Sequence, residues 1–526
     1  MNRPLLAPPA TCLIRRTMTG LLALGLLLAR AQSASAAWAA DAAQAPAPSG
    51  LTFRIAWKGG PVPKPLSGRL YVMTVAENAR RAPRFGPNWF RPEPFFARDF
   101  SDWNGETPLV LDGKCDGFPG PLAELKPARY QIQAVVRVNR DTHKIGDGPG
   151  NMYGPVVTAE LDPKRDAVVA LTVDSAAIDR PFQETSRVKL VETPSPLLSA
   201  FHKRPIKHRA AVILPDGVEK GSTGPKRPAL YIIPGFGGDY SMALHFLDSP
   251  RLAYADELVR IVLDPDCGTG HHVFADSANN GPRGRALVEE FIPFIERTFP
   301  IVADPRARLL NGHSSGGWSS LWLQVAHPGF FGGVWSTAPD PVDFRDFQRI
   351  NIYAPGENVF RDRGGEPRPI ARRDGTPVLF YEPFSRMDDV IGWGGQLGSF
   401  EAVFSPRGAD GKPRKLWDRG TGRIDPETAK SWEAYDIRLV LERDWAVLEP
   451  QLRGKLHVVT GGLDTFYLEG AVGLLQKSLA KLGSDAQIEI VPGRDHGSLL
   501  DAELARRLDA EMTARVKQWL PPSQAE

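Results

Sequence analysis

The stretch Asn311-Gly312-His313-Ser314-Ser315-Gly316-Gly317 decides the fold class of this chain. Its centre fits the pattern Gly-x-Ser-x-Gly, with a short apolar strand pattern at 307–310 before it and a helical pattern at 318–326 after it. A serine on a sharp strand-to-helix turn has a strained backbone, and the flanking glycines leave room for the turn. The pattern therefore predicts that Ser314 holds its hydroxyl clear of the edge of a sheet, where it can act as a nucleophile.

The sequence around this turn predicts an α/β domain over 186–526. Short apolar strands alternate there with helical patterns, which is typical of a mostly parallel sheet flanked by helices. The expected strands are 210–214, 229–233, 307–310, 334–336, 456–460 and 487–491, and the expected helices include 287–295, 474–482 and 504–516. The segment at about 340–450 interrupts the alternation, and an insertion of this length usually forms a lid or a binding wall.

The part of the chain before the α/β domain has a different pattern. Runs of β-branched and aromatic residues separated by Gly, Pro and Asp, without a helical period, predict an antiparallel β-sandwich at 51–185. Residues 37–50 are rich in Ala and Pro and are expected to be a linker. Exposed aromatic residues at 82–96 could bind a ligand, although such loops more often pack against a neighbouring domain.

The first 36 residues are predicted to be an export signal. Arg15 and Arg16 precede an apolar run at 18–29, and Ala34-Ser35-Ala36 fits a cleavage site. The run is too short to span a bilayer, which needs about 20 apolar residues. The mature protein is therefore expected to be periplasmic or secreted, without a stable membrane span.

Composition and charge narrow the class of protein further. Of the 526 residues 42% are hydrophobic and 24% are charged, which excludes a mainly disordered or fibrous chain. The signal segment carries four arginines and no acid, so its removal changes the net charge from +3 to −1. Strong binding to nucleic acid is therefore not expected. Cys115 and Cys267 could pair in an oxidising compartment or remain two buried thiols.

A serine hydroxyl needs a base, and His496 is the best candidate. It lies in a loop directly after the strand expected at 487–491, at the strand ends where α/β sheets place their sites. Asp464, after the strand at 456–460, is predicted to orient the imidazole. The order Ser314, Asp464, His496 is the order of the α/β-hydrolase fold. The competing carboxylates are Asp340, which is the main rival, Asp343 and Asp495.

The developing oxyanion needs preorganised N–H donors. One is expected from the backbone of Ser315, the residue after the nucleophile. The second is expected from the glycine-rich loop Pro234-Gly235-Phe236-Gly237-Gly238 after the strand at 229–233. We assign this donor to Phe236, with Gly237 as the alternative. The sequence contains no HExxH, paired CxxC, Walker or GxGxxG motif, so neither a metal nor a cofactor is expected.

With these motifs the chain resembles the Putative esterase family of α/β-hydrolases, which includes feruloyl and acetylxylan esterases, enterochelin-esterase-like proteins and S-formylglutathione hydrolases. The resemblance rests on the segments 231–239, 287–295 and 303–306 and on the Ser314 turn. It implies the nucleophile role for Ser314, the base role for His496 and the acid role for Asp464. Enterochelin-esterase-like members with an N-terminal β-domain are similar in layout.

These observations predict an exported serine esterase that hydrolyses carboxylic esters through an acyl-enzyme, with a small-molecule or saccharide-linked ester as substrate. Two alternatives stay open. The same triad could transfer the acyl group to a sugar or an alcohol. The chain could also be a non-catalytic ligand-binding protein that uses its β-domain and its aromatic loop.

Overall fold

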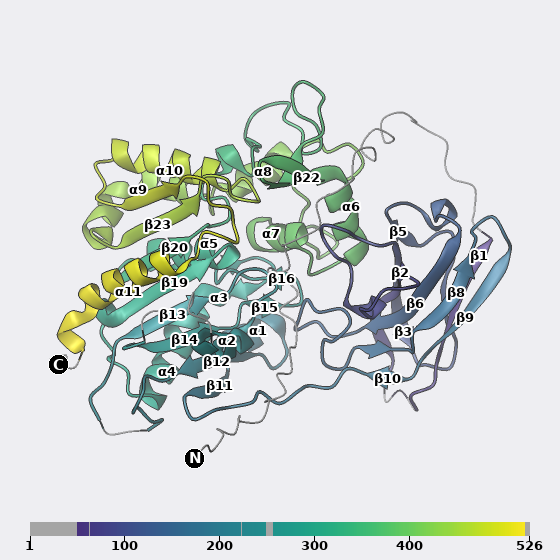
Figure 1. Cartoon of the computed structure of the whole chain (residues 1–526), viewed down its shortest axis with the longest axis horizontal. Helices are drawn as coiled ribbons and strands as arrows, with labels where there is room; N and C mark the ends of the chain where they lie inside the picture. The colour runs from purple at the N-terminus through teal and green to yellow at the C-terminus, as the bar shows by residue number, and fades with distance from the viewer. Residues whose placement is uncertain (1–49, 61, 63, 222–223, 249–255, 521–526) are drawn as a thin grey trace, which may run out of the picture. The chain divides into compact units, whose positions relative to one another are not determined.

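The computed structural model describes residues 50–60, 62, 64–221, 224–248 and 256–520 (Figure 1). The expected export signal and all of the expected linker except Gly50 lie outside the described residues. Within the described residues, no helix is both long and apolar enough to cross a bilayer. Cys115 and Cys267 are both buried free thiols, so they are not paired with each other.

An eight-stranded sheet forms the centre of the α/β domain, which confirms the predicted fold class. Numbered one to eight along the chain, its strands lie in the order 1-2-4-3-5-6-7-8. The first two pair antiparallel with their neighbours and the remaining pairs are parallel. The strands are β11 (Val188–Pro194), β12 (Lys207–Ile213), β13 (Ala229–Ile233), β14 (Val259–Leu263), β19 (Arg308–His313), β20 (Gly333–Thr337), β23 (Leu456–Gly461) and β24 (Gln487–Val491).

Helices cover both faces of this sheet because successive strand residues point in opposite directions. Tyr231 and Ile233 face one buried core, whereas Leu230 and Ile232 face the other. The first core also takes side chains from α4 (Ile292–Thr298), α5 (Ser315–Ala326), α9 (Ile437–Leu452) and α10 (Glu469–Lys481). The second core takes them from α2 (Ala243–Asp248) and α11 (Ala502–Val516). Two further helices are α1 (Pro196–His202) and α3 (Arg283–Ala286), and a π-helical turn at Leu287–Phe291 joins α3 to α4.

The N-terminal region folds into two packed β-sheets, as predicted, with one exception to the antiparallel pairing. In the smaller sheet β1 pairs in parallel with β9. The smaller sheet has the order β4-β1-β9, with β1 (Leu51–Trp57), β4 (Leu109–Leu111) and β9 (Ala167–Val173). The larger sheet has the order β10-β7-β6-β2-β3-β5, with β8 paired to β6; its strands are β2 (Leu66–Ala76), β3 (Phe95–Trp103), β5 (Asp116–Phe118), β6 (Ala128–Arg137), β7 (Met152–Tyr153), β8 (Val157–Leu161) and β10 (Ser175–Ala176).

Strand β2 joins the two domains because both of its faces are buried. Leu70 and Val72 point into the core between the two β-sheets, whereas Tyr71 and Met73 point into the first core of the α/β domain. The Tyr71 hydroxyl donates to the carbonyl of Ile391 over 2.5 Å. The N-terminal β-domain is therefore packed directly onto the segment that interrupts the α/β pattern.

That segment packs onto the core of the α/β domain, with the ring centroids of Phe404 and Trp318 of α5 5.1 Å apart. It contains β21 (Pro369–Arg373), β22 (Thr376–Phe380), α6 (Tyr381–Ile391), α7 (Gln396–Phe404) and α8 (Pro426–Trp432). Aromatic rings hold it together, with Phe404 and Trp432 centroids 5.1 Å apart and Phe344 in contact with both. Helix α9, which falls within the range expected for the insertion, packs against α5 and so belongs to the helical layer beside the sheet.

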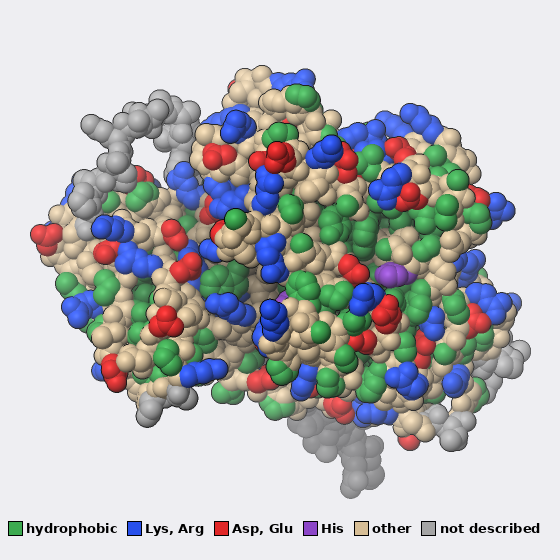
Figure 2. Space-filling view, turned by 180° about the vertical axis from the view of Figure 1, so that it is seen from behind, with side chains coloured by type: hydrophobic (Ala, Val, Ile, Leu, Met, Phe, Trp, Pro, Cys, Tyr) green, Lys and Arg blue, Asp and Glu red, His purple; other side chains and the backbone are tan. Residues whose placement is uncertain are grey.

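One face of the molecule carries side chains of both charges. On the face in Figure 2, basic and acidic side chains are interspersed, with hydrophobic side chains between them. Such mixing accords with the small net charge of the sequence.

Candidate active site

Ser314 occupies a strained turn between β19 and α5, as the motif predicts. Its φ is 61° and its ψ is −127°, a conformation that costs a non-glycine residue about 1–3 kcal/mol. The two motif glycines are required by space. A Cβ on Gly312 would lie 2.1 Å from the Gly316 carbonyl oxygen, and a Cβ on Gly316 would lie 1.9 Å from that of Ile233. The surrounding structure therefore imposes the strain and presents Ser314 at the carboxyl edge of the sheet.

Asp464 and His496 form a hydrogen-bonded pair on the loops that follow two adjacent parallel strands, β23 and β24. Imidazole Nδ1 lies 2.7 Å from Asp464 Oδ2. The Asp464 carboxylate is fully buried, and its other oxygen accepts from the backbone N–H of Phe466 over 2.8 Å. Because Nδ1 donates to the carboxylate, Nε2 is the imidazole nitrogen left to act as a base.

The imidazole of His496 lies beside the serine turn. Its ring centroid is 4.6 Å from that of His313, the residue before Ser314, and 5.1 Å from that of Phe466. In the part of the chain that the structure describes, the Ser314 hydroxyl forms no hydrogen bond. Such bonds often tighten only when substrate binds, and the contact from Ser314 to His496 stays a prediction.

Burial and charge act in opposite directions on His496. Burial lowers its pKa, but the charge and the hydrogen bond of Asp464, together with the charge of Asp340, more than offset this. The net result is a pKa above the ordinary 6.5. The same interactions that raise this pKa therefore stabilise the protonated form of the imidazole.

The rival carboxylates have other partners. Asp340 Oδ2 accepts from the Ser315 hydroxyl over 2.5 Å, and burial raises the pKa of Asp340 to about 6. Asp343 pairs with Arg345 and Arg438, and Asp495 accepts from the backbone N–H of Ser498. Of the four carboxylates that the sequence offered, Asp464 is therefore the one hydrogen-bonded to the imidazole.

The glycine-rich loop after β13 lies against the serine turn. A Cβ added to Gly235 would be 3.2 Å from Ser314 Cβ and 3.8 Å from its Oγ. His271 Nε2 donates to the Pro234 carbonyl over 2.8 Å, while its Nδ1 accepts from the N–H of Val273. Burial lowers the pKa of His271 to about 4, so the ring stays neutral and keeps this tautomer. The loop is thus held beside Ser314, and the donor role of the Phe236 or Gly237 backbone stays a prediction.

Three residues of the N-terminal β-domain, Trp89, His143 and Lys144, contact the glycine-rich loop and the residue that follows it. We call these three residues the β-domain clasp. The ring centroids of Trp89 and His143 lie 5.6 and 5.5 Å from that of Phe236. Lys144 Nζ lies 2.6 Å from Asp239 Oδ2, three residues after Phe236. The sequence marked the aromatic stretch but not the clasp, because neither His143 nor Lys144 belongs to a local motif.

Replacing Lys144 by methionine is expected to lower kcat about ten- to hundredfold with a small change in KM. The substitution keeps the apolar stem but leaves the carboxylate of Asp239 without its ion-pair partner, which loosens the oxyanion loop. Steady-state kinetics on a nitrophenyl ester provides the measurement. Lys144→Arg should restore most of the rate, and Lys164→Met, an exposed site in the same domain, should leave it unchanged. Equal losses in Lys144→Met and Lys164→Met would refute the role of the clasp.

No group of three or more His, Cys, Asp or Glu that could hold a metal ion occurs among the described residues.

Comparisons with known proteins place the chain in a family. No curated protein matches the chain. Similar solved structures include an S-formylglutathione hydrolase from Agrobacterium tumefaciens (13% identity, 64% of this chain, 98% of that chain, TM-score 0.39) and a ferulic acid esterase from Anaeromyces mucronatus (14%, 64%, 92%, 0.32). A third is a fluorophosphonate-binding serine hydrolase from Staphylococcus aureus (15%, 63%, 99%, 0.38). Residues 206–496, more than half of the chain, match the family described as Putative esterase, and the chain therefore belongs to that family.

Proposed function

We propose that this chain is an exported serine hydrolase of carboxylic esters. The observation that carries the proposal is the buried Asp464–His496 pair beside the strained Ser314 turn. An orienting carboxylate, a base and a serine on an exposed turn, supplied by three separate loops at one sheet edge, are the requirements of acyl-enzyme chemistry. The export part rests on the sequence pattern of the first 36 residues.

In the first half of the reaction the Ser314 oxygen attacks the ester carbonyl and His496 Nε2 takes the serine proton. The carbonyl oxygen becomes an oxyanion, which the backbone N–H groups of Ser315 and Phe236 bind. Each such donor is worth roughly 3–4 kcal/mol of barrier. The tetrahedral intermediate then breaks its bond to the alcohol oxygen, and the imidazolium supplies the proton to the departing alcohol.

In the second half water attacks the acyl-enzyme. His496 takes the proton of that water, the oxyanion forms again in the same place, and the bond to Ser314 Oγ breaks with return of the proton to the serine. Asp464 stays ionised throughout and stabilises the imidazolium. The products are a carboxylic acid and an alcohol, so the reaction consumes one water for each ester bond.

The surroundings of the serine favour an ester with a flat, apolar group. The partly exposed Phe236 ring lies on the loop that contacts Ser314 through Gly235 and packs against Trp89, and the Phe466 ring packs on His496. Aromatic faces bind planar apolar groups well. We therefore place aromatic acyl or aryl esters ahead of short acetyl esters as substrates.

A panel of nitrophenyl, feruloyl, acetyl-sugar and siderophore esters, assayed with the purified full chain, tests the proposal. The expected result is hydrolysis of at least one aromatic ester together with labelling of the serine by a fluorophosphonate. Added alcohols should leave acid as the main product, whereas predominant formation of new esters would identify an acyltransferase. An intact chain that neither takes the label nor hydrolyses any ester would favour a binding protein.

The pH dependence follows from the raised pKa of His496. The imidazole must be neutral to accept the serine proton, so kcat/KM should rise with pH through this pKa and level off above it. Because the pKa is raised, the midpoint of the acid limb should lie above 6.5. A pH–rate profile in buffers of constant ionic strength measures it. An acid limb centred well below 6.5 would show that the Asp464 charge does not act on the catalytic base.

A further inference from the structure

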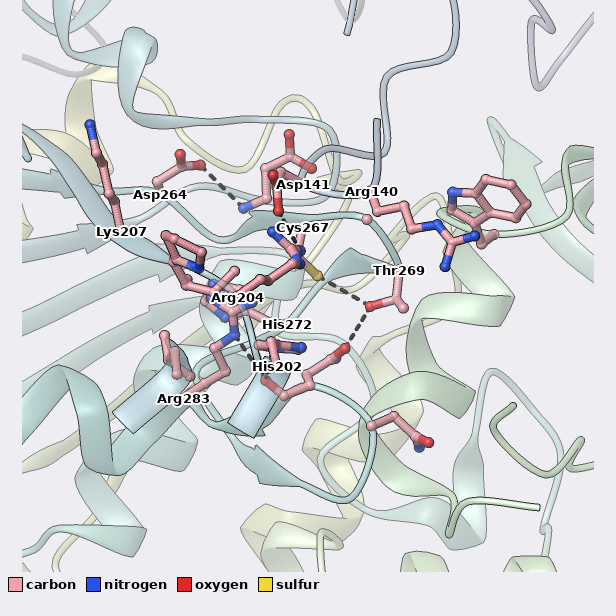
Figure 3. Close-up of a pocket in the computed structure, with 18 of the residues that line it drawn as sticks. Arg140, Asp141, His202, Arg204, Lys207, Asp264, Cys267, Thr269, His272 and Arg283 are labelled. Atoms are coloured by element: carbon pink, nitrogen blue, oxygen red, sulfur yellow. Dashed lines mark hydrogen bonds and ion pairs between the residues drawn. The ribbon is translucent and has the colours of Figure 1, made fainter. Parts of the chain in front are cut away.

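The molecule contains a second, separate hollow, shown in Figure 3. It is a cavity of about 1030 Å³ between the β-domain, the start of the α/β domain and the loops that follow β14. Neither Ser314, Asp464 nor His496 is among the described residues that line it. Cavities at domain junctions are frequent ligand sites, and none of the steps proposed for the triad uses this one.

More basic than acidic side chains line this cavity. It is lined by six basic residues, Arg140, Arg204, Lys207, Arg209, Arg283 and Lys412, and by four acidic residues, Asp99, Asp141, Asp264 and Asp266. Three of the four carboxylates already have partners, which are Arg69, Arg204 and His143. Burial raises the pKa of the fourth, Asp264, to about 8, so it carries little charge at neutral pH. The cavity as a whole therefore has an excess of positive charge.

Of the six basic residues, Arg204 pairs with Asp141, and Lys207 and Arg209 pair with Glu192, whereas Arg140, Arg283 and Lys412 form no ion pair with a described carboxylate. Arg140 and Lys412 are exposed, so Arg283 is the partly buried cation of the lining that lacks a counter-ion. Its Nε donates to the backbone carbonyl of Asn280 over 3.1 Å. Burial lowers its pKa, as expected for a charge removed from water without compensation. Figure 3 shows Arg283 together with His202, His272 and Arg204 on the cavity wall. Arg204 is neutralised by Asp141 at 2.5 Å.

A second donor beside Arg283 also lacks a partner. Asn280 is 3% exposed, its Oδ1 accepts from the Thr269 hydroxyl over 2.7 Å, and its Nδ2 has no hydrogen-bond partner among the described residues. A buried amide N–H₂ left unbonded costs about 1–3 kcal/mol. Asn280 lines the same cavity as Arg283, so one acceptor group on a ligand could satisfy both.

The cavity also has an apolar side. Phe100, Phe274, Phe291, Leu198 and Ile206 contribute to its lining. We propose that this cavity binds a small organic carboxylate, with the carboxylate on Arg283 and Asn280 and the apolar body of the ligand against these side chains. A carboxylate fits because it accepts from a guanidinium and an amide at the same time and supplies the missing negative charge.

Calorimetric titration of the full chain with benzoate and hexanoate, and with the neutral amides benzamide and hexanamide, tests the site. Saturable one-to-one binding of at least one carboxylate, at least about tenfold tighter than its amide, is expected. Ser314→Ala should bind equally well, because the cavity does not include the triad. Binding that disappears in Ser314→Ala would place the carboxylate at the active site and overturn the proposal.

Two variants locate the binding. Arg283→Met should weaken carboxylate binding at least about tenfold, whereas Lys430→Gln, which removes an exposed charge on α8, should not. Asn280→Asp keeps the shape but gives Arg283 a counter-ion within the protein, so it should also weaken binding. Without ligand, both cavity variants should unfold at the same or a higher temperature than the wild type, since each removes an uncompensated group. Unchanged affinity in Arg283→Met, equal binding of the amides, or preferential binding of inorganic phosphate would overturn the proposal.

Discussion

Replacing Ser314 by alanine is expected to lower kcat for ester hydrolysis by roughly 10⁴-fold or more and to abolish labelling by a fluorophosphonate. In the proposed reaction the serine oxygen forms and breaks the bond to the acyl group, and Ser314 is the only serine or threonine with a positive φ among the described residues. Residual activity should be that of a site which binds and polarises the ester without attacking it. Steady-state kinetics and gel fluorescence of the labelled protein provide the two measurements.

Alanine should not disturb the fold at this position, because the hydroxyl of Ser314 makes no hydrogen bond in the described structure and φ is already positive. The unfolding temperature of Ser314→Ala should therefore remain close to that of the wild type. Ser431→Ala, a serine on α8 remote in sequence from the site, serves as the matched control and should keep full activity. Wild-type labelling in Ser314→Ala would mean that the nucleophile is another residue.

Asp464→Asn is expected to lower kcat by about 10⁴-fold, whereas Asp340→Asn should cost tenfold or less. Both carboxylates are buried near the imidazole, but only Asp464 hydrogen-bonds to it. An amide at 464 presents an N–H to Nδ1 or an uncharged acceptor, so the tautomer and the charge that support the base are both lost. An amide at 340 can still accept from the Ser315 hydroxyl, and Asp340 is already partly protonated near neutral pH.

The pair of variants separates the orienting role from a general effect of burying a negative charge. The pH–rate profile adds a second readout, because loss of the Asp464 charge should move the acid limb of Asp464→Asn to lower pH. Circular dichroism and thermal unfolding establish that both variants fold. Equal losses of kcat in the two variants, or a larger loss in Asp340→Asn, would move the acid role to Asp340.

Much of the fold follows from local pattern. Each of the six strands predicted for the α/β domain is found in the sheet. A short apolar run between two helices can bury its side chains in few ways other than as a strand of a central sheet. Two strands were missed. β11 is an edge strand with partly exposed residues, so its apolar signal is weak. β14 carries Arg260 in the middle of a fully buried run, which hides its apolar character.

For the candidate site too, local sequence identified some residues and left the choice of others to the fold. The local sequence identifies Ser314, since the turn motif is a property of a few adjacent residues. It could only rank Asp464 above Asp340, because both follow strands of the same sheet and the choice depends on which loop reaches His496. The loops after β23 and β24 are neighbours in the sheet, and this adjacency brings Asp464 to the imidazole.

The sequence by itself determined the sheet-and-helix class of the main domain, the serine turn and a short set of partners for it, because strand periodicity and turn chemistry act over a few adjacent residues. Only the tertiary structure decided which carboxylate hydrogen-bonds to the imidazole, that Lys144 and Trp89 of the β-domain contact the glycine-rich loop after β13, and that Arg283 lines a cavity without a counter-ion. These contacts join residues up to about a hundred and fifty positions apart in the chain. The packing of separate elements and domains sets the distances in these contacts, and a pattern of adjacent residues cannot predict that packing.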